Sequence, residues 1–281
     1  MKIKAYKREN GEVGIRNHLL ILPASVCAGH TAVKIAEQID EAIALPHEHG
    51  CCQMGADHEQ TVRTLIGLGK NPNVGAVLVV GLGCEGVEPD NLAEKISETG
   101  KPVEKITIQG LGGTLKTIAE GTRIARNMAQ DLVKMERTEV DLSKIVLGIE
   151  CGGTDATSGI AANPAVGGAS DKLLEQGGTA MLSETTEIIG AEHVMAERTV
   201  SEEVKEKLLD IVERTEERAL DCGVDLRGSQ PTPGNIEGGV TTIEEKSLGC
   251  TYKAGSAPIQ DVLEYAEKVD GNGFYIMDTP G

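Results

Sequence analysis

The sequence is poor in aromatic residues: its 281 residues include one Phe, four Tyr and no Trp. The core must therefore be built from aliphatic side chains and methionine. Recognition of nucleic-acid bases by aromatic stacking is disfavoured for the same reason. A chain of this length can form one large α/β domain or two smaller ones.

Positive charge and long apolar runs are also scarce. The 27 Lys and Arg residues face 44 Asp and Glu residues, which gives a formal net charge of −17. No basic patch is evident that would neutralise phosphates. No apolar run approaches the ~20 residues needed to cross a bilayer. We therefore expect neither a nucleic-acid nor a membrane partner.

The first 16 residues are charged and polar throughout, unlike a secretory signal. Seven cysteines, an odd number, then favour reduced thiols in the cytoplasm over a disulfide framework. The sequence stops just after an apolar strand pattern, so we expect the natural chain to be longer.

Short apolar runs alternate with amphipathic stretches. The pattern predicts strands over residues 19–22, 74–80, 105–108 and 145–149, and helices over residues 31–42, 60–68, 91–98 and 114–135. This alternation predicts an α/β fold with a Rossmann-like, mainly parallel sheet and flanking helices. Further strands over 179–183 and 274–277 and a helix over 201–219, with Ser201 as N-cap, predict a second α/β portion. We assign the domains to residues 1–150 and 151–281.

Three cysteines lie in glycine-flanked turns after strand-like or extended runs: Cys51, Cys84 and Cys151. Glycine lets the backbone approach a ligand closely, which a core cysteine does not require. Thiolates grouped with imidazoles and carboxylates favour iron or zinc. Cys84 and Cys151 also follow predicted strands, where parallel sheets bind ligands. We interpret the three as one metal site; the alternative is three small buried side chains.

Residues 81–86 match the dinucleotide motif G-x-G-x-x-G. However, the following helix is expected to begin only near Pro89, too late to support a pyrophosphate. The next predicted strand ends at Ile108 and Gln109, where an NAD enzyme carries an acidic residue. An NAD-dependent oxidoreductase is therefore a disfavoured alternative.

Several longer segments carry a more specific signal. They are Gly11-Glu-Val-Gly-Ile-Arg-Asn17, His47-Glu-His-Gly-Cys51, Gly83-Cys-Glu85, Cys151-Gly-Gly-Thr-Asp-Ala-Thr-Ser-Gly-Ile-Ala-Ala-Asn-Pro-Ala165, an acidic segment with Glu184, Glu187 and Glu192, Pro233-Gly-Asn235 and Lys253-Ala-Gly-Ser-Ala-Pro258. Together they resemble the altronate/galactarate dehydratase family, which includes the large subunit of sulfolactate sulfo-lyase. The resemblance runs from about residue 6 to the end of the sequence.

The resemblance implies an iron-dependent hydro-lyase acting on a sugar acid such as altronate or galactarate. A base would remove the α-proton and the β-hydroxyl would leave through a metal-stabilised enediolate. A sulfo-lyase would expel sulfite from the same intermediate. The family's C-terminal portion and its small SAF-type domain are absent from this sequence, so a small SAF-domain partner subunit is expected. Outside the enzymes, a non-catalytic thiolate metal-binding module is the alternative.

The candidate iron ligands are Cys51, Cys84 and Cys151, holding either Fe²⁺ or an iron–sulfur cluster, with Cys52 in reserve. Cys27, Cys222 and Cys250 lack comparable neighbours, and Cys222 is interpreted as helix packing.

The candidate acid–base residues are His47, His49, Asp155 and Glu184. An Asx-turn at Ser158 is the alternative role for Asp155. Arg16 and Lys253 are candidates for binding a substrate carboxylate, with Gly152, Gly153 and Asn163 shaping the loop. The general base, the particular hydroxy acid and a homo-oligomeric state are left open.

Overall fold

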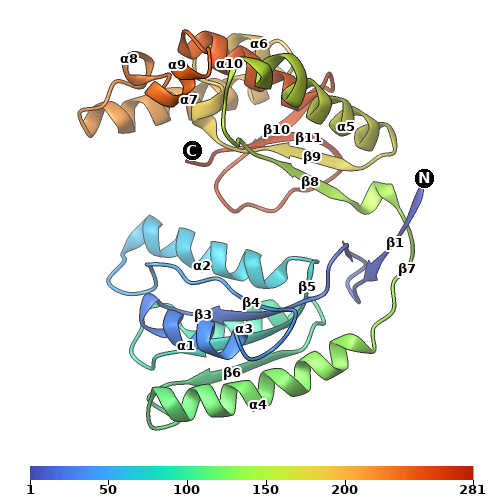
Figure 1. Cartoon of the computed structure of the whole chain (residues 1–281), viewed down its shortest axis with the longest axis vertical. Helices are drawn as coiled ribbons and strands as arrows, with labels where there is room; N and C mark the ends of the chain where they lie inside the picture. Colours follow the sequence, from blue (N-terminus) through green and yellow to red (C-terminus); the bar gives the residue numbers. More distant parts are fainter. Residues whose placement is uncertain (281) are drawn as a thin grey trace. The chain divides into compact units, whose positions relative to one another are not determined.

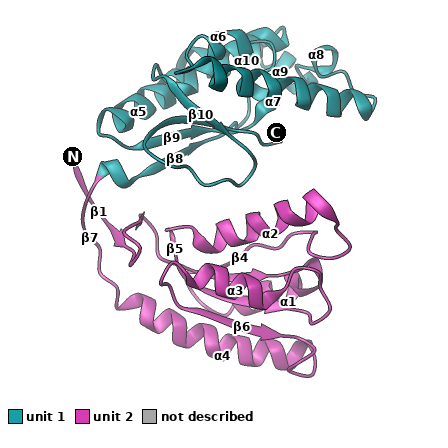
Figure 2. Ribbon diagram, turned by 180° about the vertical axis from the view of Figure 1, so that it is seen from behind, with its two compact units in different colours: residues 1, 142–281 teal, residues 2–141 magenta. Residues whose placement is uncertain are grey.

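The computed structural model describes residues 1–280. They divide into two compact units, one of residues 2–141 and one of residue 1 with residues 142–281 (Figure 2). Each unit contains its own four-stranded parallel sheet. The predicted α/β fold with parallel sheets and flanking helices is therefore confirmed. Strand β8, which lies before residue 150, pairs with β9 in the second unit.

The first unit is a parallel sheet with helices on both faces. The strand order is β4-β3-β5-β6, where β3 is His18–Pro23, β4 is Ala42–Ala44, β5 is Val74–Gly81 and β6 is Val103–Thr107. Helices α1 (Val26–Ala36) and α4 (Thr114–Val133) pack on one face, and α2 (Gly55–Lys70) and α3 (Pro89–Ser97) pack on the other. Because β3 and β5 are covered on both faces, they are almost continuously apolar.

The helix predicted over residues 31–42 is wrong at both ends. Helix α1 begins at Val26 and ends at Ala36, and residues 42–44 form the edge strand β4. Glu41 takes a φ of 66°, which no continuing right-handed helix allows. The small apolar residues on either side of this turn fit a helical period and a half-buried strand equally well, so periodicity alone could not separate them.

A small antiparallel sheet, which the sequence did not predict, joins the two ends of the first unit. Strand β1 (Lys2–Lys7) pairs with β2 (Val13–Gly14) and with β7 (Thr138–Asp141). The buried Arg8 follows β1 and donates to the Pro72 carbonyl at 2.7 Å and to the Asn17 side chain at 2.8 Å. Arg8 thereby fixes the entrance to β3.

The second unit has the strand order β10-β11-β9-β8. Its strands are β8 (Val146–Ile149), β9 (Thr179–Leu182), β10 (Ile259–Leu263) and β11 (Gly273–Met277); its helices are α5 (Asn163–Glu175), α6 (Glu192–Ala196), α7 (Glu202–Asp221), α8 (Leu226–Ser229), α9 (Pro233–Glu237) and α10 (Ile243–Thr251). Helices α5, α7 and α10 lie on the same side of the sheet (Figure 1).

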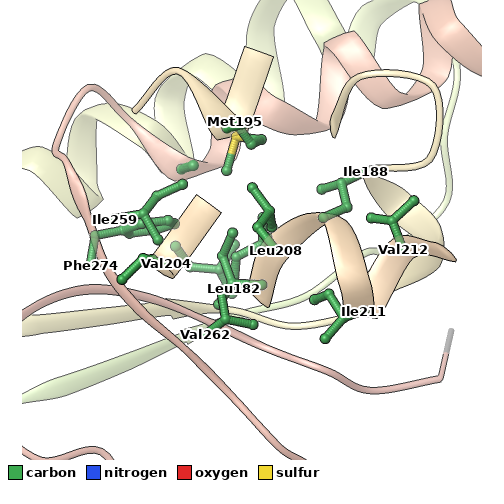
Figure 3. Close-up of a cluster of buried hydrophobic side chains, with 14 of the residues drawn as sticks. Leu182, Ile188, Met195, Val204, Leu208, Ile211, Val212, Ile259, Val262 and Phe274 are labelled. Atoms are coloured by element: carbon green, nitrogen blue, oxygen red, sulfur yellow. The ribbon is translucent and has the colours of Figure 1, made fainter. Parts of the chain in front are cut away.

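The core of the second unit is largely aliphatic, as the scarcity of aromatic residues predicted. Leu182, Leu208 and Ile211 belong to one buried cluster with Phe274, the single phenylalanine of the chain (Figure 3). Ser201 caps α7 as predicted, accepting a hydrogen bond from the Val204 amide at 3.3 Å. Among the described helices, none is both long and apolar enough to cross a membrane.

Two adjacent glycines of α5 allow a matched test of packing. A Cβ atom at Gly167 would collide with the Tyr252 carbonyl oxygen, whereas one at Gly168 would meet nothing within 4 Å. We expect Gly167→Ala to destabilise the protein by about 1–3 kcal/mol through overpacking. Gly168→Ala should stabilise it by up to ~1 kcal/mol through helix propensity. Urea unfolding measures both, and equal effects would contradict the packing of α5.

Candidate active site

The candidate site of the second unit lies at the carboxyl ends of neighbouring strands. Cys151 follows β8 and Glu184 follows β9, and the last residues of these strands, Ile149 and Leu182, pair directly. The Cys151 amide donates to the Glu184 carboxylate at 2.5 Å. The Glu184 amide donates to the Thr279 hydroxyl at 2.6 Å, beyond the end of β11. These bonds tie the segments that follow β8, β9 and β11 to one another and hold the Glu184 carboxylate against the Cys151 backbone.

Glu187 completes a group of three metal-ligating side chains. It ends the single turn Thr185–Glu187 and is only 5% exposed. Ligand atoms of Cys151, Glu184 and Glu187 all lie within 4.8 Å of one another. One sulfur and two carboxylate oxygens form a donor set that suits a divalent transition metal and leaves coordination positions for substrate or water.

Positive charge surrounds Glu187 on its other side. Its carboxylate oxygens lie 3.2 Å from the Lys246 ammonium and 3.6 Å from that of Lys253, and the Cys250 thiol donates at 2.6 Å. Lys253 is only 4% exposed. Burial raises the pKa of Glu187, but the Cys250 hydrogen bond and the charges of the two lysines outweigh it, so the pKa lies below its usual value. Glu187 is therefore ionised at neutral pH.

The two thiols of the site have raised pKa values. Burial is the main cause for Cys151, with the Glu187 charge adding to it and the Thr154 hydroxyl opposing it. Burial and the negative charge of Glu187 also raise the pKa of Cys250. Without a bound cation both thiols are protonated at neutral pH, and a bound cation would favour the Cys151 thiolate.

The loop after Cys151 is held by its own polar side chains. The Asp155 carboxylate accepts from the Thr157 amide at 2.8 Å, from the Thr157 hydroxyl at 2.6 Å and from the Ser158 amide at 3.0 Å. These bonds form an Asx-turn and lower the pKa of Asp155. Asn163 donates to the Gly249 carbonyl at 2.8 Å, which ties the start of α5 to α10. Gly152 and Gly153 are exposed.

The first unit carries the remaining sequence-predicted residues. His47 Nδ1 accepts from the His49 amide at 3.2 Å, and His47 Nε2 lies 2.9 Å from the Pro23 carbonyl. Both ring nitrogens of His47 are thus engaged by the backbone in the Nε2–H tautomer, whereas the His49 ring is exposed. Exposed Arg16 precedes β3 and lies at the amino end of the sheet.

Cys51 and Cys84 are brought together on adjacent loops of the first unit. The Gly50 carbonyl accepts from the Gly86 amide at 3.0 Å and from the Val87 amide at 3.2 Å. Both cysteines are exposed, as is Cys52. The two loops therefore meet at the carboxyl edge of the first sheet.

The G-x-G-x-x-G segment is already occupied by a side chain of the protein. The Glu85 carboxylate accepts from the amides of Leu82 at 3.0 Å, Gly83 at 2.6 Å and Cys84 at 2.9 Å. These are the amides that would cradle a pyrophosphate in a dinucleotide site. Helix α3 begins at Pro89, as the sequence predicted. This geometry argues against nicotinamide binding at the turn.

Sequence reasoning did not assign Glu187, Lys246 or Cys250 to the site. Signals for them existed: Glu187 follows Glu184 by three residues, and residues 246, 250 and 253 have the spacing of one helical face. The interpretation of Cys222 as helix packing is wrong, because Cys222 is exposed at the end of α7.

Comparison with known proteins shows the family. Residues 5–133 match the model for the D-galactarate dehydratase/altronate hydrolase second domain, and residues 142–281 match that for the D-galactarate/altronate dehydratase C-terminal domain. The chain belongs to the D-galactarate/altronate dehydratase family, which confirms the resemblance found in its motifs.

Named relatives include lyases of two kinds. The chain is 43% identical to (2R)-sulfolactate sulfo-lyase subunit beta of Chromohalobacter salexigens over 280 residues, which are 98% of the chain and 70% of that protein. It is 35% identical to altronate dehydratase of Bacillus subtilis over 99% of the chain and 57% of the relative. It is 37% identical to galactarate dehydratase (L-threo-forming) of Escherichia coli over 78% of the chain and 43% of the relative.

The charge balance at Glu187 gives a testable prediction. Glu187→Gln leaves the buried Lys253 without its counter-charge, so we expect a loss of about 3 kcal/mol in unfolding free energy. Folding lowers the pKa of Glu187, so the ionised carboxylate stabilises the folded state fully above its unfolded-state pKa of about 4.3. This stabilisation is lost as the pH falls through the folded-state pKa of Glu187.

The control is Glu202→Gln, which removes an exposed ion pair with Lys205 and should change stability by less than about 1 kcal/mol. Urea titrations between neutral pH and pH ~3 compare the variants with the parent, because the stabilisation is lost only below the unfolded-state pKa. A Glu187→Gln protein that is as stable as the parent would contradict the described ion pairs.

Proposed function

We propose that this chain is the catalytic part of a metal-dependent hydro-lyase acting on a sugar acid. The observation that carries the proposal is the group Cys151, Glu184 and Glu187 at adjoining strand ends, backed by the buried Lys253. Family membership supports it, because relatives are named altronate and galactarate dehydratases. Loss of sulfite from sulfolactate is the second candidate, favoured by the 43% identity to a sulfo-lyase subunit.

Charge counting supports a divalent cation in this group. Two carboxylates and one thiolate carry three negative charges, and Lys246 and Lys253 return two positive ones. With Cys151 protonated the group is neutral; a divalent cation displaces that proton and leaves a net charge of +1. A substrate carboxylate then restores neutrality. When bound, the metal supplies Lewis-acid stabilisation of the charge that develops on the substrate carboxylate.

The acid–base residues are proposed from the chemistry of their surroundings. Elimination requires a base for the α-proton and an acid for the leaving oxygen. Asp155, with four hydrogen bonds to its carboxylate and a lowered pKa, is a weak base. His47 is engaged at both nitrogens, so His49 is the stronger candidate among the three. Glu184 would hold the metal and Lys253 the substrate carboxylate. Arg16 lies at the amino end of its sheet, away from the strand ends that carry His49, and its role stays a prediction of the sequence.

The proposal includes iron as the metal and a small partner subunit. Iron ligation by Cys51 and Cys84 in the same site as Cys151 stays a prediction of the sequence. One relative is named a beta subunit, and the chain spans less than 60% of the length of the altronate dehydratase it matches. We therefore expect full turnover from the longer assembly, with a small SAF-type subunit, and weak turnover from residues 1–281 alone.

Metal content tests the ligand set. Protein prepared without oxygen should bind Fe²⁺, and Cys151→Ala or Glu184→Gln should weaken binding at least ~10-fold. Cys222→Ala, an exposed cysteine of the same unit, is the matched control and should bind normally. Because Cys151 must lose a proton, affinity should rise about tenfold per pH unit below its raised pKa. Equal iron in all variants would refute the site.

Solvent hydrogen exchange tests the reaction class. With altronate, galactarate or sulfolactate, the complete enzyme should exchange the substrate α-hydrogen with deuterated water. His49→Asn should lower this exchange by about 10²-fold or more while iron remains bound, because a base does not hold the metal. Asp155→Asn serves as the comparison. Near-native exchange in both variants would place the base elsewhere.

A further inference from the structure

Two adjacent cysteines of the first unit, Cys51 and Cys52, are both exposed. Their sulfur atoms lie 3.8 Å apart, close to van der Waals contact. Unpaired cysteines are among the residues most often buried in proteins. An exposed pair whose sulfur atoms meet therefore calls for an explanation other than packing.

The backbone at Cys52 accounts for this contact. Consecutive side chains of an extended chain point to opposite faces, which keeps neighbouring cysteines apart. Cys52 instead takes a φ of 59°, in the left-handed region that residues other than glycine seldom adopt. The turn interrupts the alternation, so the two sulfur atoms can meet.

Hydrogen bonds hold the loop that carries the two cysteines. The Val26 amide at the start of α1 donates to the His49 carbonyl at 2.9 Å. The Gly50 carbonyl accepts from the Gly86 amide, after β5, at 3.0 Å. The Gly50 amide donates to the Gln53 side chain at 3.2 Å, which closes the loop across the pair. The backbone on either side of the cysteines is therefore held while their side chains stay exposed.

Two thiols in this position can be joined by a bond that is easily broken again. Consecutive Cα atoms lie about 3.8 Å apart across a trans peptide, which is less than the ~4.4–6.8 Å that most disulfides span. A disulfide between neighbouring residues therefore closes a small, strained ring. Strained and exposed disulfides are readily reduced, and reversible rather than structural disulfides have this character.

We propose that Cys51 and Cys52 form a reversible oxidation site, at which a low-molecular-weight disulfide such as oxidised glutathione converts the two thiols into one disulfide. One cysteine thiolate attacks a sulfur of the oxidant and releases one thiol; the other cysteine then attacks the mixed disulfide and releases the second thiol. The two cysteines lose two electrons and two protons, and the oxidant gains both as it becomes two thiols. Because Cys51 is also a predicted iron ligand, oxidation would withdraw its thiolate from a metal.

Peptide mass spectrometry tests the site, because trypsin cleavage after Lys34 and Arg63 releases both cysteines in one peptide that contains no other cysteine. The reduced full-length chain is treated with oxidised glutathione, alkylated and then digested. We expect this peptide to be two hydrogen atoms lighter than its reduced form and to carry no alkyl group. Excess reduced glutathione, added before alkylation, should restore two alkylated cysteines.

Cys51→Ser and Cys52→Ser should each keep glutathione on the remaining cysteine, because no neighbouring thiol expels it. Cys27→Ser, Cys84→Ser and Cys222→Ser remove other exposed cysteines and are the matched controls, which should form the disulfide as the parent does. A disulfide from the peptide to Cys27 or Cys84, a lasting glutathione adduct in the parent, or full alkylation after oxidation would overturn the proposal. Circular dichroism checks that each variant is folded. Turnover does not enter this test, so its outcome is independent of the proposed lyase activity.

Discussion

The candidate active site depends on one buried charge, the carboxylate of Glu187. Its hydrogen bond from Cys250 and its ion pairs with Lys246 and Lys253 tie the turn after β9 to α10 and to the turn that follows α10. The Glu187 amide in turn donates to the Glu184 carbonyl at 2.9 Å. Without the two lysines, Glu184 and Glu187 would repel each other and any thiolate at Cys151. The lysines therefore allow a compact anionic ligand set to exist inside a folded protein.

The two units use cysteine in opposite settings, and the difference is chemical. In the second unit, Cys151 and Cys250 are at least partly buried beside carboxylates, which keeps their thiols protonated until a cation arrives. In the first unit the cysteines are exposed, and the neighbouring Glu85 is fully engaged with backbone amides. Hard and soft donors therefore lie together at the candidate site of the second unit, a mixture that suits a divalent transition metal.

Much of this arrangement could be predicted where the signal is local. The apolar runs of β3 and β5 identify buried parallel strands, and glycine-flanked Cys84 and Cys151 mark the strand ends. Local spacing marks Glu187 and Cys250 separately, but their contact could not be predicted, because it spans 63 positions of sequence. The predicted end of α1 was wrong for another reason. The alanines on either side of Glu41 continue the helical spacing of apolar residues, but Glu41 itself takes a left-handed conformation that a helix does not allow.

The small sheet that closes the first unit also bears on how such proteins are assembled. Lys2 pairs with Asp141, so the first and last residues of this unit lie side by side on antiparallel strands. A domain whose ends adjoin can be inserted into, or removed from, another chain with little disturbance to its host. By this geometry, residues 2–141 are a module that evolution could splice, permute or exchange as one piece.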